Sequence, residues 1–411
     1  MSSSAPAKPV VLVYAEPLLA RSMTFIRTQA EALESFSPYY ISPHLERAGL
    51  PLPEERVEVM RGSQGPFARL TEVPFKLLGM APLFLRRLRR LRPALLHAHF
   101  GFAGLRALPL ARALGIPLVV TFQGCDATMS DESLRASDSY SARDYVRRRK
   151  VLDRGATLFI AVSRFIQDEV LRQGFSPKKL VVHYVGVDTE LFSPQAGVKR
   201  EAFVLFTGRL DEKKGCEYLI RAMGKVQERL PTAELVLIGD GPLRVPLEQL
   251  AHQHLSSYRF LGFQPPEVVR HWMNRARIFA APSVRARSGD AEGYPNVFAE
   301  AQSMALPVVS FSSDGVREAV IHGKTGLLAP ERDVEALADH LRGLYADPNR
   351  CSQMGEAARA HVCAHFNLRI QTRTLEQLYL RALGRDNAQQ IFQTRAESDD
   401  EGPIETLVSQ R

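Results

Sequence analysis

Short runs of β-branched and apolar residues alternate with longer stretches of helical periodicity along most of the chain. This alternation predicts parallel α/β sheets, because each strand reaches its parallel neighbour through a crossover helix. We expect strands at Val10–Tyr14, Leu95–His99, Leu118–Phe122, Leu158–Val162, Leu180–Tyr184, Phe203–Thr207, Glu234–Ile238, Ile278–Ala281 and Val308–Phe311.

The strands fall into two groups, and a chain of 411 residues is long enough for two domains. Glycine, proline and serine between Phe192 and Gly197 indicate a linker. We therefore expect one doubly wound domain over residues 1–195 and a second over 196–385. The last helix should end near Leu383. Polar and acidic residues dominate 386–411, which predicts a disordered tail.

The composition is that of an ordinary soluble globular protein, with 45% hydrophobic and 24% charged residues. No run approaches 18 uncharged apolar residues, so we expect no transmembrane helix. The N-terminus lacks the charged-then-apolar order of a signal peptide. The four cysteines (Cys125, Cys216, Cys351 and Cys363) form no CxxC pair. These features predict a reduced, cytoplasmic location.

The positive charge is concentrated in one half of the chain. Residues 1–195 carry 26 lysines and arginines against 18 acidic residues, whereas 196–411 carry 27 of each. Its densest part is a predicted helix near residues 84–92 with a leucine stripe. Two interpretations stay open: contact with an anionic membrane surface, or a solvated face above leucines that point inward. The basic residues concerned are Arg86, Arg87, Arg89 and Arg90. Few interleaved aromatics and no binding motif argue against nucleic acid.

Two carboxylates eight residues apart are the most informative feature for function. Glu292 precedes a turn that contains Gly293 and Pro295, and Glu300 follows within a predicted helix that starts near Asn296 as its cap. Free backbone N–H groups at a helix start can hold an anion. A sugar, a phosphate and a ribose could therefore be held in sequence along this segment.

Glycine turns and two cations follow the first strands of the second half. Gly208 ends one strand and allows a ligand to approach the backbone, and Arg209 and Lys214 follow it. Cations at that point would stabilise a departing diphosphate more in the transition state than in the ground state. A second turn begins at Gly239. Taken alone, the two cations are better explained as surface charges of a basic protein, and a glycine turn between strand and helix is common for purely geometric reasons.

Taken together, the motifs resemble glycosyltransferase family 4, and among its members they are most similar to bacterial exopolysaccharide and lipopolysaccharide sugar transferases. The resemblance covers roughly residues 10–385. In the second half it is carried by FTGRLDEKKG (206–215), LVLIGDGPLR (235–244), FLGF (260–263), FAAPS (279–283), EGYPNVFAEA (292–301), LPVVSFSSDGVREAV (306–320) and HGKTGLLAP (322–330). In the first half it is carried by HAHFGFAG (97–104), VVTFQGCD (119–126), IAVSRFI (160–166) and VVHYVGVD (181–188).

The resemblance implies the GT-B fold, which is two facing Rossmann-like domains with a cleft between them. It implies that Arg209 and Lys214 hold the donor diphosphate, that Glu292 contacts the transferred sugar, and that Glu300 binds the nucleotide ribose. The remaining donor-binding residues would be Gly208, Gly239, Gly293, Tyr294, Pro295 and Asn296. The acceptor side would contain Ser22, Thr24, His99, Gln123 and Asp126.

The implied activity is that of a retaining, metal-independent hexosyltransferase without a cofactor. It would move a sugar from a UDP- or GDP-sugar to a hydroxyl of a growing, lipid-linked glycan in polysaccharide or lipopolysaccharide biosynthesis. Such an enzyme would work in the cytoplasm, at the inner face of the membrane. The alternatives are a nucleotide-sugar 2-epimerase on the same architecture and an inactive sugar-nucleotide-binding or scaffold subunit. Many relatives have histidine where this chain has Gln123, which cannot titrate near neutral pH.

Overall fold

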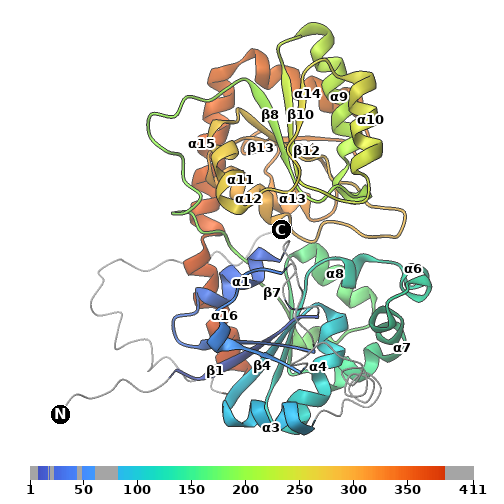
Figure 1. The fold of residues 1–411 in the computed structure, drawn as a ribbon, viewed down its shortest axis with the longest axis vertical. Coiled ribbons are helices and arrows are strands. Elements are labelled where there is room, and N and C mark those ends of the chain that lie inside the picture. Colours follow the sequence, from blue (N-terminus) through green and yellow to red (C-terminus); the bar gives the residue numbers. More distant parts are fainter. Residues whose placement is uncertain (1–7, 17, 19–22, 44–48, 61–81, 385–411) are drawn as a thin grey trace, which may run out of the picture.

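A computed structural model describes residues 8–16, 18, 23–43, 49–60 and 82–384, which form two parallel α/β domains (Figure 1). Both sheets are entirely parallel in the pairings between named strands, which agrees with the alternation of strand and helix in the sequence. Within these ranges no helix is both long enough and apolar enough to cross a bilayer. The predicted tail at 386–411 lies outside the described residues.

The first domain has a seven-stranded sheet in the order β3-β2-β1-β4-β5-β6-β7. Its strands are β1 (Val10–Tyr14), β2 (Ser37–Ser42), β3 (Val57–Val59), β4 (Pro93–His99), β5 (Leu118–Phe122), β6 (Leu158–Ala161) and β7 (Leu180–Val182). Its helices are α1 (Thr24–Glu31), η1 (Glu54–Arg56), α3 (Pro82–Arg90), α4 (Gly101–Leu114), α5 (Cys125–Thr128), α6 (Asp131–Ala136), α7 (Tyr140–Gly155), α8 (Arg164–Arg172) and η2 (Pro177–Lys179).

The second domain has a six-stranded sheet in the order β10-β9-β8-β11-β12-β13. Its strands are β8 (Phe203–Thr207), β9 (Glu234–Ile238), β10 (Tyr258–Phe260), β11 (Ile278–Ala280), β12 (Val308–Phe311) and β13 (Gly326–Ala329). The helices after β8 are η3 (Glu212–Lys214), α9 (Cys216–Arg229), α10 (Arg244–His254), α11 (Pro266–Arg275), α12 (Asn296–Ser303), α13 (Val316–Ala319), α14 (Val334–Ala346), α15 (Pro348–His365) and α16 (Leu368–Ala382).

Each sheet reverses its winding direction at a pair of adjacent central strands. In the first sheet these strands are β1 and β4, and in the second they are β8 and β11. Doubly wound sheets bind ligands just beyond the carboxyl ends of such a pair. His99 is the last residue of β4, and the loops after β8 and β11 contain Arg209 and Glu292, respectively. The topology therefore places the predicted site residues where this class of fold binds its ligands.

All of the predicted strands are present: the bounds of β1, β5, β8, β9 and β12 are as predicted, and one end of β4, β6, β7 and β11 differs by one or two residues. Strands β2, β3, β10 and β13 were not predicted. Strands β3, β10 and β13 lie at sheet edges and have only three or four residues, so their hydrophobic pattern is weak. Strand β2 begins with Ser37-Pro38, a pair that predicts a turn rather than a strand.

Alternating residues of the first sheet pack into two separate layers. Leu12, Val120 and Phe159 face α4, α7 and α8, whereas Val13 and Val119 face the opposite layer. That opposite layer also contains Leu375 and Tyr379 of α16. This pattern follows from the period of two in a β-strand, which sends successive side chains to opposite faces.

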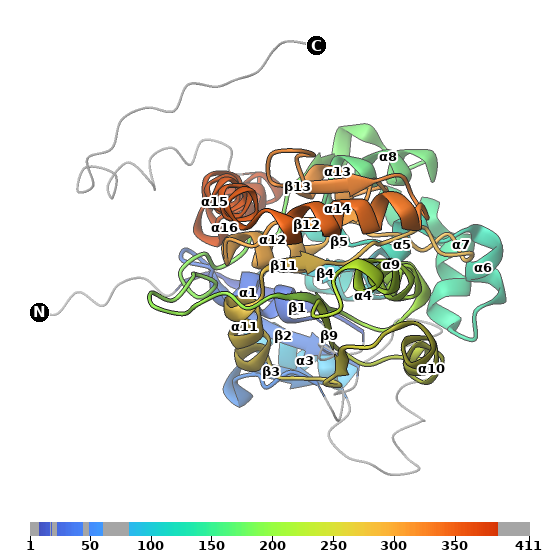
Figure 2. The same ribbon diagram turned by 90° about the horizontal axis from the view of Figure 1, so that it is seen from above.

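Helix α16 follows the second domain in the sequence but packs against the first. The backbone N–H of Ser35 donates to Glu376 Oε1 at 2.6 Å, and the Tyr379 hydroxyl lies 2.7 Å from His97 Nδ1. Figure 2 shows α15 and α16 on the same side of the molecule, where the chain returns toward the first sheet. The boundary at residue 195 separates the two sheets, but residues 368–382 are spatially part of the first domain.

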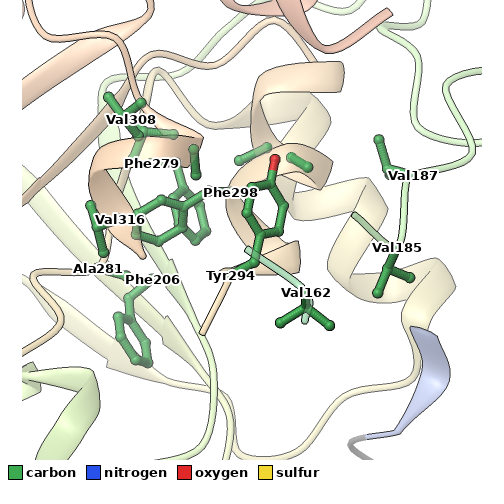
Figure 3. Packing of buried hydrophobic residues seen from close by; sticks show 14 of the residues in the cluster. Val162, Val185, Val187, Phe206, Phe279, Ala281, Tyr294, Phe298, Val308 and Val316 are labelled. Atoms are coloured by element: carbon green, nitrogen blue, oxygen red, sulfur yellow. The ribbon is translucent and has the colours of Figure 1, made fainter. Parts of the chain in front are cut away.

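The two domains share one continuous apolar contact around Tyr294. Its ring lies between Phe298 of the second domain and Val185 and Val187 of the connecting segment (Figure 3). It also contacts Tyr184 and Phe366, with ring centroids 5.3 Å and 5.2 Å away. The domains are therefore joined through the segment that contains the predicted sugar-binding residues.

Candidate active site

The carboxyl ends of β8, β9 and β10 form a glycine-lined surface. Gly208 N donates to Ile238 O at 3.0 Å, and Gly239 N donates to Gly262 O at 2.8 Å. Gly239 has a φ of +142°, and a Cβ atom there would lie 1.8 Å from Gly208 O. No side chain can be accommodated at Gly239 without moving the backbone. The predicted residues Gly208 and Gly239 therefore lie in direct contact.

Lys214 and Glu292 form the central ion pair of the candidate site. Lys214 ends the short helix η3 after β8, and Glu292 lies in the loop after β11. Their Nζ and Oε1 atoms are 2.5 Å apart, and Glu292 is only 7% exposed. Burial raises the pKa of Glu292, but the charges of Lys214 and Lys213 outweigh it, and the pKa ends below its usual value. Glu292 is therefore ionised at neutral pH.

A second ion pair adjoins the first and was not predicted from the sequence. Lys213 Nζ lies 3.2 Å from both oxygens of Asp290. Burial lowers the pKa of Lys213, but the charges of Glu292 and Asp290 outweigh it, and the pKa ends above its usual value. The pair of lysines in Glu212-Lys213-Lys214 was visible in the sequence, but Asp290 is 77 residues away, so nothing local indicated their contact.

Arg209 leaves the same strand end but remains exposed. Its side chain is 66% exposed, and its nearest acidic partner in the described residues is Asp211, with Nε and Oδ2 3.7 Å apart. Because this ion pair is long and solvated, it adds little to stability. The guanidinium of Arg209 is therefore available to bind an anion.

Glu300 lies on the second turn of α12 and is half-buried. In the described part of the chain its carboxylate makes no hydrogen bond or ion pair. Burial raises the pKa of Glu300 to about 7. Even a partly buried carboxylate without a partner costs free energy of folding, so such a group is a candidate for ligand binding.

The loop between Glu292 and α12 is in close contact with the first domain on one side and with the cap of α13 on the other. A Cβ atom on Gly293 would lie 2.2 Å from Gln123 O of the first domain, and one on Gly315 would lie 2.0 Å from Gly293 O. Only glycine fits at these two points. Asn296 was expected to cap α12, but it is the first helical residue, and Pro295 occupies the cap without a side-chain hydrogen bond. Among the described residues, no side chain caps the first amides of α12.

On the first domain, His99 and Gln123 are in contact. Gln123 Nε2 lies 3.2 Å from His99 Nδ1, and burial lowers the pKa of His99 to about 3. The neutral ring accepts a hydrogen bond from the Gln123 amide at Nδ1, which leaves Nε2 protonated. The Gln123 side chain therefore has a fixed orientation and cannot itself titrate.

Asp126 is fully buried and faces the backbone. Its oxygens accept from the N–H groups of Gly101 at 2.7 Å, Gln123 at 3.1 Å and Gly124 at 3.0 Å. It therefore fixes the loops after β4 and β5, and its effect on an acceptor would pass through these loops. Thr24 begins α1 and is half-buried, whereas Ser22 lies outside the described residues.

The pair of histidines on β4 has a structural role. His97 is buried, and its two ring nitrogens lie 2.7 Å from the hydroxyls of Tyr379 and Thr121. Its ring also contacts that of His99, as expected for residues two positions apart in a strand. No group of three or more His, Cys, Asp or Glu side chains among the described residues is arranged to hold a metal ion.

Comparison with known proteins identifies the family. The family model described as Glycosyltransferase Family 4 matches residues 39–191, and that of Glycosyl transferases group 1 matches 188–361. The amylovoran biosynthesis glycosyltransferase AmsK of Erwinia amylovora is 32% identical over 286 residues, which cover 68% of each chain. The chain belongs to glycosyltransferase family 4. A GDP-mannose-dependent phosphatidylinositol monomannoside mannosyltransferase of Mycolicibacterium smegmatis is 30% identical to this glycosyltransferase over 298 residues, or 68% of this chain and 75% of that one.

Solved structures confirm the GT-B fold of this glycosyltransferase. Sucrose-phosphate synthase from Thermosynechococcus elongatus superimposes with a TM-score of 0.73 at 21% identity, over 92% of this chain and 100% of that one. Anabaena HepE in complex with UDP-glucose has a TM-score of 0.69 at 18% identity, over 90% and 99% of the two chains. At these identities the likeness establishes the fold alone.

Proposed function

We propose that this glycosyltransferase moves a hexose from a UDP- or GDP-sugar to a hydroxyl of a growing, lipid-linked glycan in bacterial polysaccharide or lipopolysaccharide biosynthesis. The buried ion pair of Lys214 and Glu292 is the observation that carries this proposal. It lies at the β8/β11 switch point, where a doubly wound sheet binds its ligand. The relatives' names support the substrate class, since AmsK acts in amylovoran biosynthesis and the mycobacterial enzyme is GDP-mannose-dependent.

In this proposal the cations bind the donor diphosphate. Breaking the glycosidic bond places extra negative charge on the diphosphate, and Arg209, Lys213 and Lys214 supply positive charge beside the strand end. Preorganised cations stabilise that developing charge without needing to reorient. For this reason we propose that the transfer needs neither a divalent metal nor a cofactor.

The remaining predicted residues would bind the rest of the donor. Glu292, held ionised by its lysines, would accept hydrogen bonds from hydroxyls of the transferred sugar, and Glu300 would accept them from the ribose. The backbone of residues 293–296 would hold the sugar and the distal phosphate. We propose retention of the anomeric configuration, with a donor phosphate oxygen helping to take the acceptor proton on the same face.

The basic helix α3 supports a membrane-associated acceptor. Phe84 and Leu88 are buried and anchor the helix, whereas Leu83 is 74% exposed. Arg86, Arg89 and Arg90 are exposed, but Arg87 pairs with Glu58 at 2.7 Å and bonds to Val59 O. Arg89 also donates to Ala113 O at 3.0 Å. An exposed leucine beside exposed arginines is the composition that favours an anionic bilayer surface. We therefore propose that the protein works at the inner face of the cytoplasmic membrane.

The test is a thermal-shift panel of UDP-glucose, UDP-galactose, GDP-mannose and CDP-glucose, followed by mass spectrometry of products formed with a lipid extract. A donor that binds only the folded state raises the melting temperature. We expect a shift with one nucleotide class that is lost in Glu300→Ala, and turnover of that donor. Binding without turnover under any acceptor condition would instead identify an inactive sugar-nucleotide-binding subunit, for which Gln123 is the main argument.

A further inference from the structure

Helix α8 of the first domain begins at the contact with the second domain, and Ser163 is its cap. Ser163 is fully buried, and its Oγ accepts from Ile166 N at 3.1 Å. The same hydroxyl donates to Gly293 O at 2.6 Å. One side chain therefore both caps a helix of the first domain and holds the backbone next to Glu292 in the second.

Glu318 makes the reverse connection, from α13 of the second domain to α8. Its two oxygens accept from the first amides of α8, Arg164 N at 3.0 Å and Phe165 N at 2.8 Å. The Tyr184 hydroxyl donates to Glu318 Oε2 at 2.6 Å. A carboxylate at the positive end of a helix dipole makes charge-assisted hydrogen bonds, which are stronger than neutral ones. Figures 1 and 2 both show α8 beside α13.

Both connections lead to the same loop. Gly315, at the cap of α13, donates its N–H to Glu292 O at 3.2 Å and lies against Gly293. The Tyr184 ring, whose hydroxyl bonds to Glu318, packs on Tyr294. The backbone from 292 to 294 is therefore held by contacts from the cap of α8, from the cap of α13 and from Tyr184, and Glu318 ties the last two to the N-terminus of α8.

We infer that Ser163 and Glu318 are positioning residues, which set the geometry of the Glu292–Gly293 loop through the N-terminus of α8 and do so only when the two domains are docked. This inference rests on the proposed role of that loop in binding the transferred sugar. In the described part of the chain, neither side chain contacts Arg209, Lys214 or Glu300. We call the contacts of Ser163 and Glu318 at the N-terminus of α8 the clasp. Binding of a nucleoside monophosphate, which lacks the distal phosphate and the sugar, should be independent of the clasp, whereas sugar transfer should depend on it.

The experiment compares Ser163→Ala and Glu318→Ala with Ser139→Ala in the full-length protein. Ser139 is a matched control because it caps α7 through Ala142 N but lies on the surface, away from the domain contact. Hydrogen–deuterium exchange follows the amides of residues 291–296, and calorimetry with UMP and GMP gives the affinity for the part of the donor that does not reach this loop. Turnover is measured with whichever nucleotide-sugar of the panel the wild type consumes.

We expect faster exchange at 291–296 in both clasp variants and a fall in kcat of about tenfold for Ser163→Ala, as expected for the loss of one buried hydrogen bond. UMP or GMP affinity should stay within about twofold of the wild type. Ser139→Ala should change neither exchange in this loop nor kcat. If the wild type turns over donor, an unchanged kcat in Ser163→Ala would overturn the inference. Unchanged exchange at 291–296 in both clasp variants would overturn it as well. A wild type that consumes no donor would instead contradict the proposed function, and the exchange result would still decide whether the clasp fixes the loop.

Discussion

The Nζ atom of Lys214 lies 2.5 Å from Oε1 of Glu292, although the two residues are separated by 78 positions and follow different strands. The contact exists because β8 and β11 are neighbours in the sheet, so their carboxyl-end loops converge. A buried carboxylate would normally tend toward the protonated form, but two lysines keep this one charged. The carboxylate of Glu292 is thus ionised before any donor binds.

Loss of the charge at Glu292 should reduce transfer far more than it reduces stability. Glu292→Gln keeps the size of the side chain but removes the negative charge paired with Lys214, and Lys214→Met removes the cation. Each should lower kcat by about 10²–10³, the usual cost of losing one preorganised transition-state contact. Steady-state kinetics on the identified donor would measure this. Glu335→Gln, which disrupts the exposed pair of Lys225 and Glu335, is the control and should keep full activity.

Glu300 should make stability depend on pH in an unusual direction. Its pKa is raised from 4.5 to about 7 by burial, so between these values the folded state binds more protons than the unfolded state. The free energy of unfolding should therefore fall as pH rises from about 4.5 to 7. In the wild type the free energy of unfolding should fall by an amount on the order of 2 kcal/mol over this range, and Glu300→Gln should abolish this fall. Urea unfolding at pH 5 and pH 8 would measure both. An identical pH dependence in the variant and the wild type would rule out this role.

The hydroxyl of Tyr294 should be dispensable for stability. The side chain is buried, and its hydroxyl has no hydrogen-bond partner among the described residues. Tyr294→Phe keeps the ring contacts with Tyr184 and Phe366 and removes an unsatisfied polar group. We expect the variant to be as stable as the wild type or more stable by about 1 kcal/mol, because an unpaired buried hydroxyl costs about that much. Thermal unfolding would measure it, and a loss of stability would mean that the hydroxyl has a partner.

Helix α3 should bind anionic bilayers through its exposed arginines. Arg86→Glu with Arg90→Glu reverses two exposed charges without touching Arg87, which is tied to Glu58. We expect co-sedimentation with phosphatidylglycerol vesicles to fall by about tenfold or more, since each basic residue near the surface contributes about 1 kcal/mol. Arg147→Glu with Lys150→Glu makes the same charge change on exposed positions of α7. If both double variants lost binding equally, net charge rather than α3 would be responsible.

Much of the fold could be predicted because its signals are local. The central strands β1, β5, β8, β9 and β12 have the predicted bounds, since buried parallel strands are short apolar runs between turn residues. Edge strands such as β3 and β10 escaped prediction because three residues carry too little periodicity. Gly293 could be recognised as part of a turn, but its contact with Gln123 O depends on how the two domains dock.

The sequence by itself determined the succession of strands and helices, the two-domain division by sheet, and the acidic and basic residues that mark the candidate site. These properties depend on periodicity, on turn residues and on motifs whose members lie within about ten positions. Only the tertiary structure decided that Lys213 meets Asp290, that Asp126 faces backbone amides, that α16 returns to the first sheet, and that Ser163 and Glu318 hold the loop at Glu292. Each of these contacts joins positions on separate loops or helices, and a hydrogen bond between such positions leaves no local pattern in the chain.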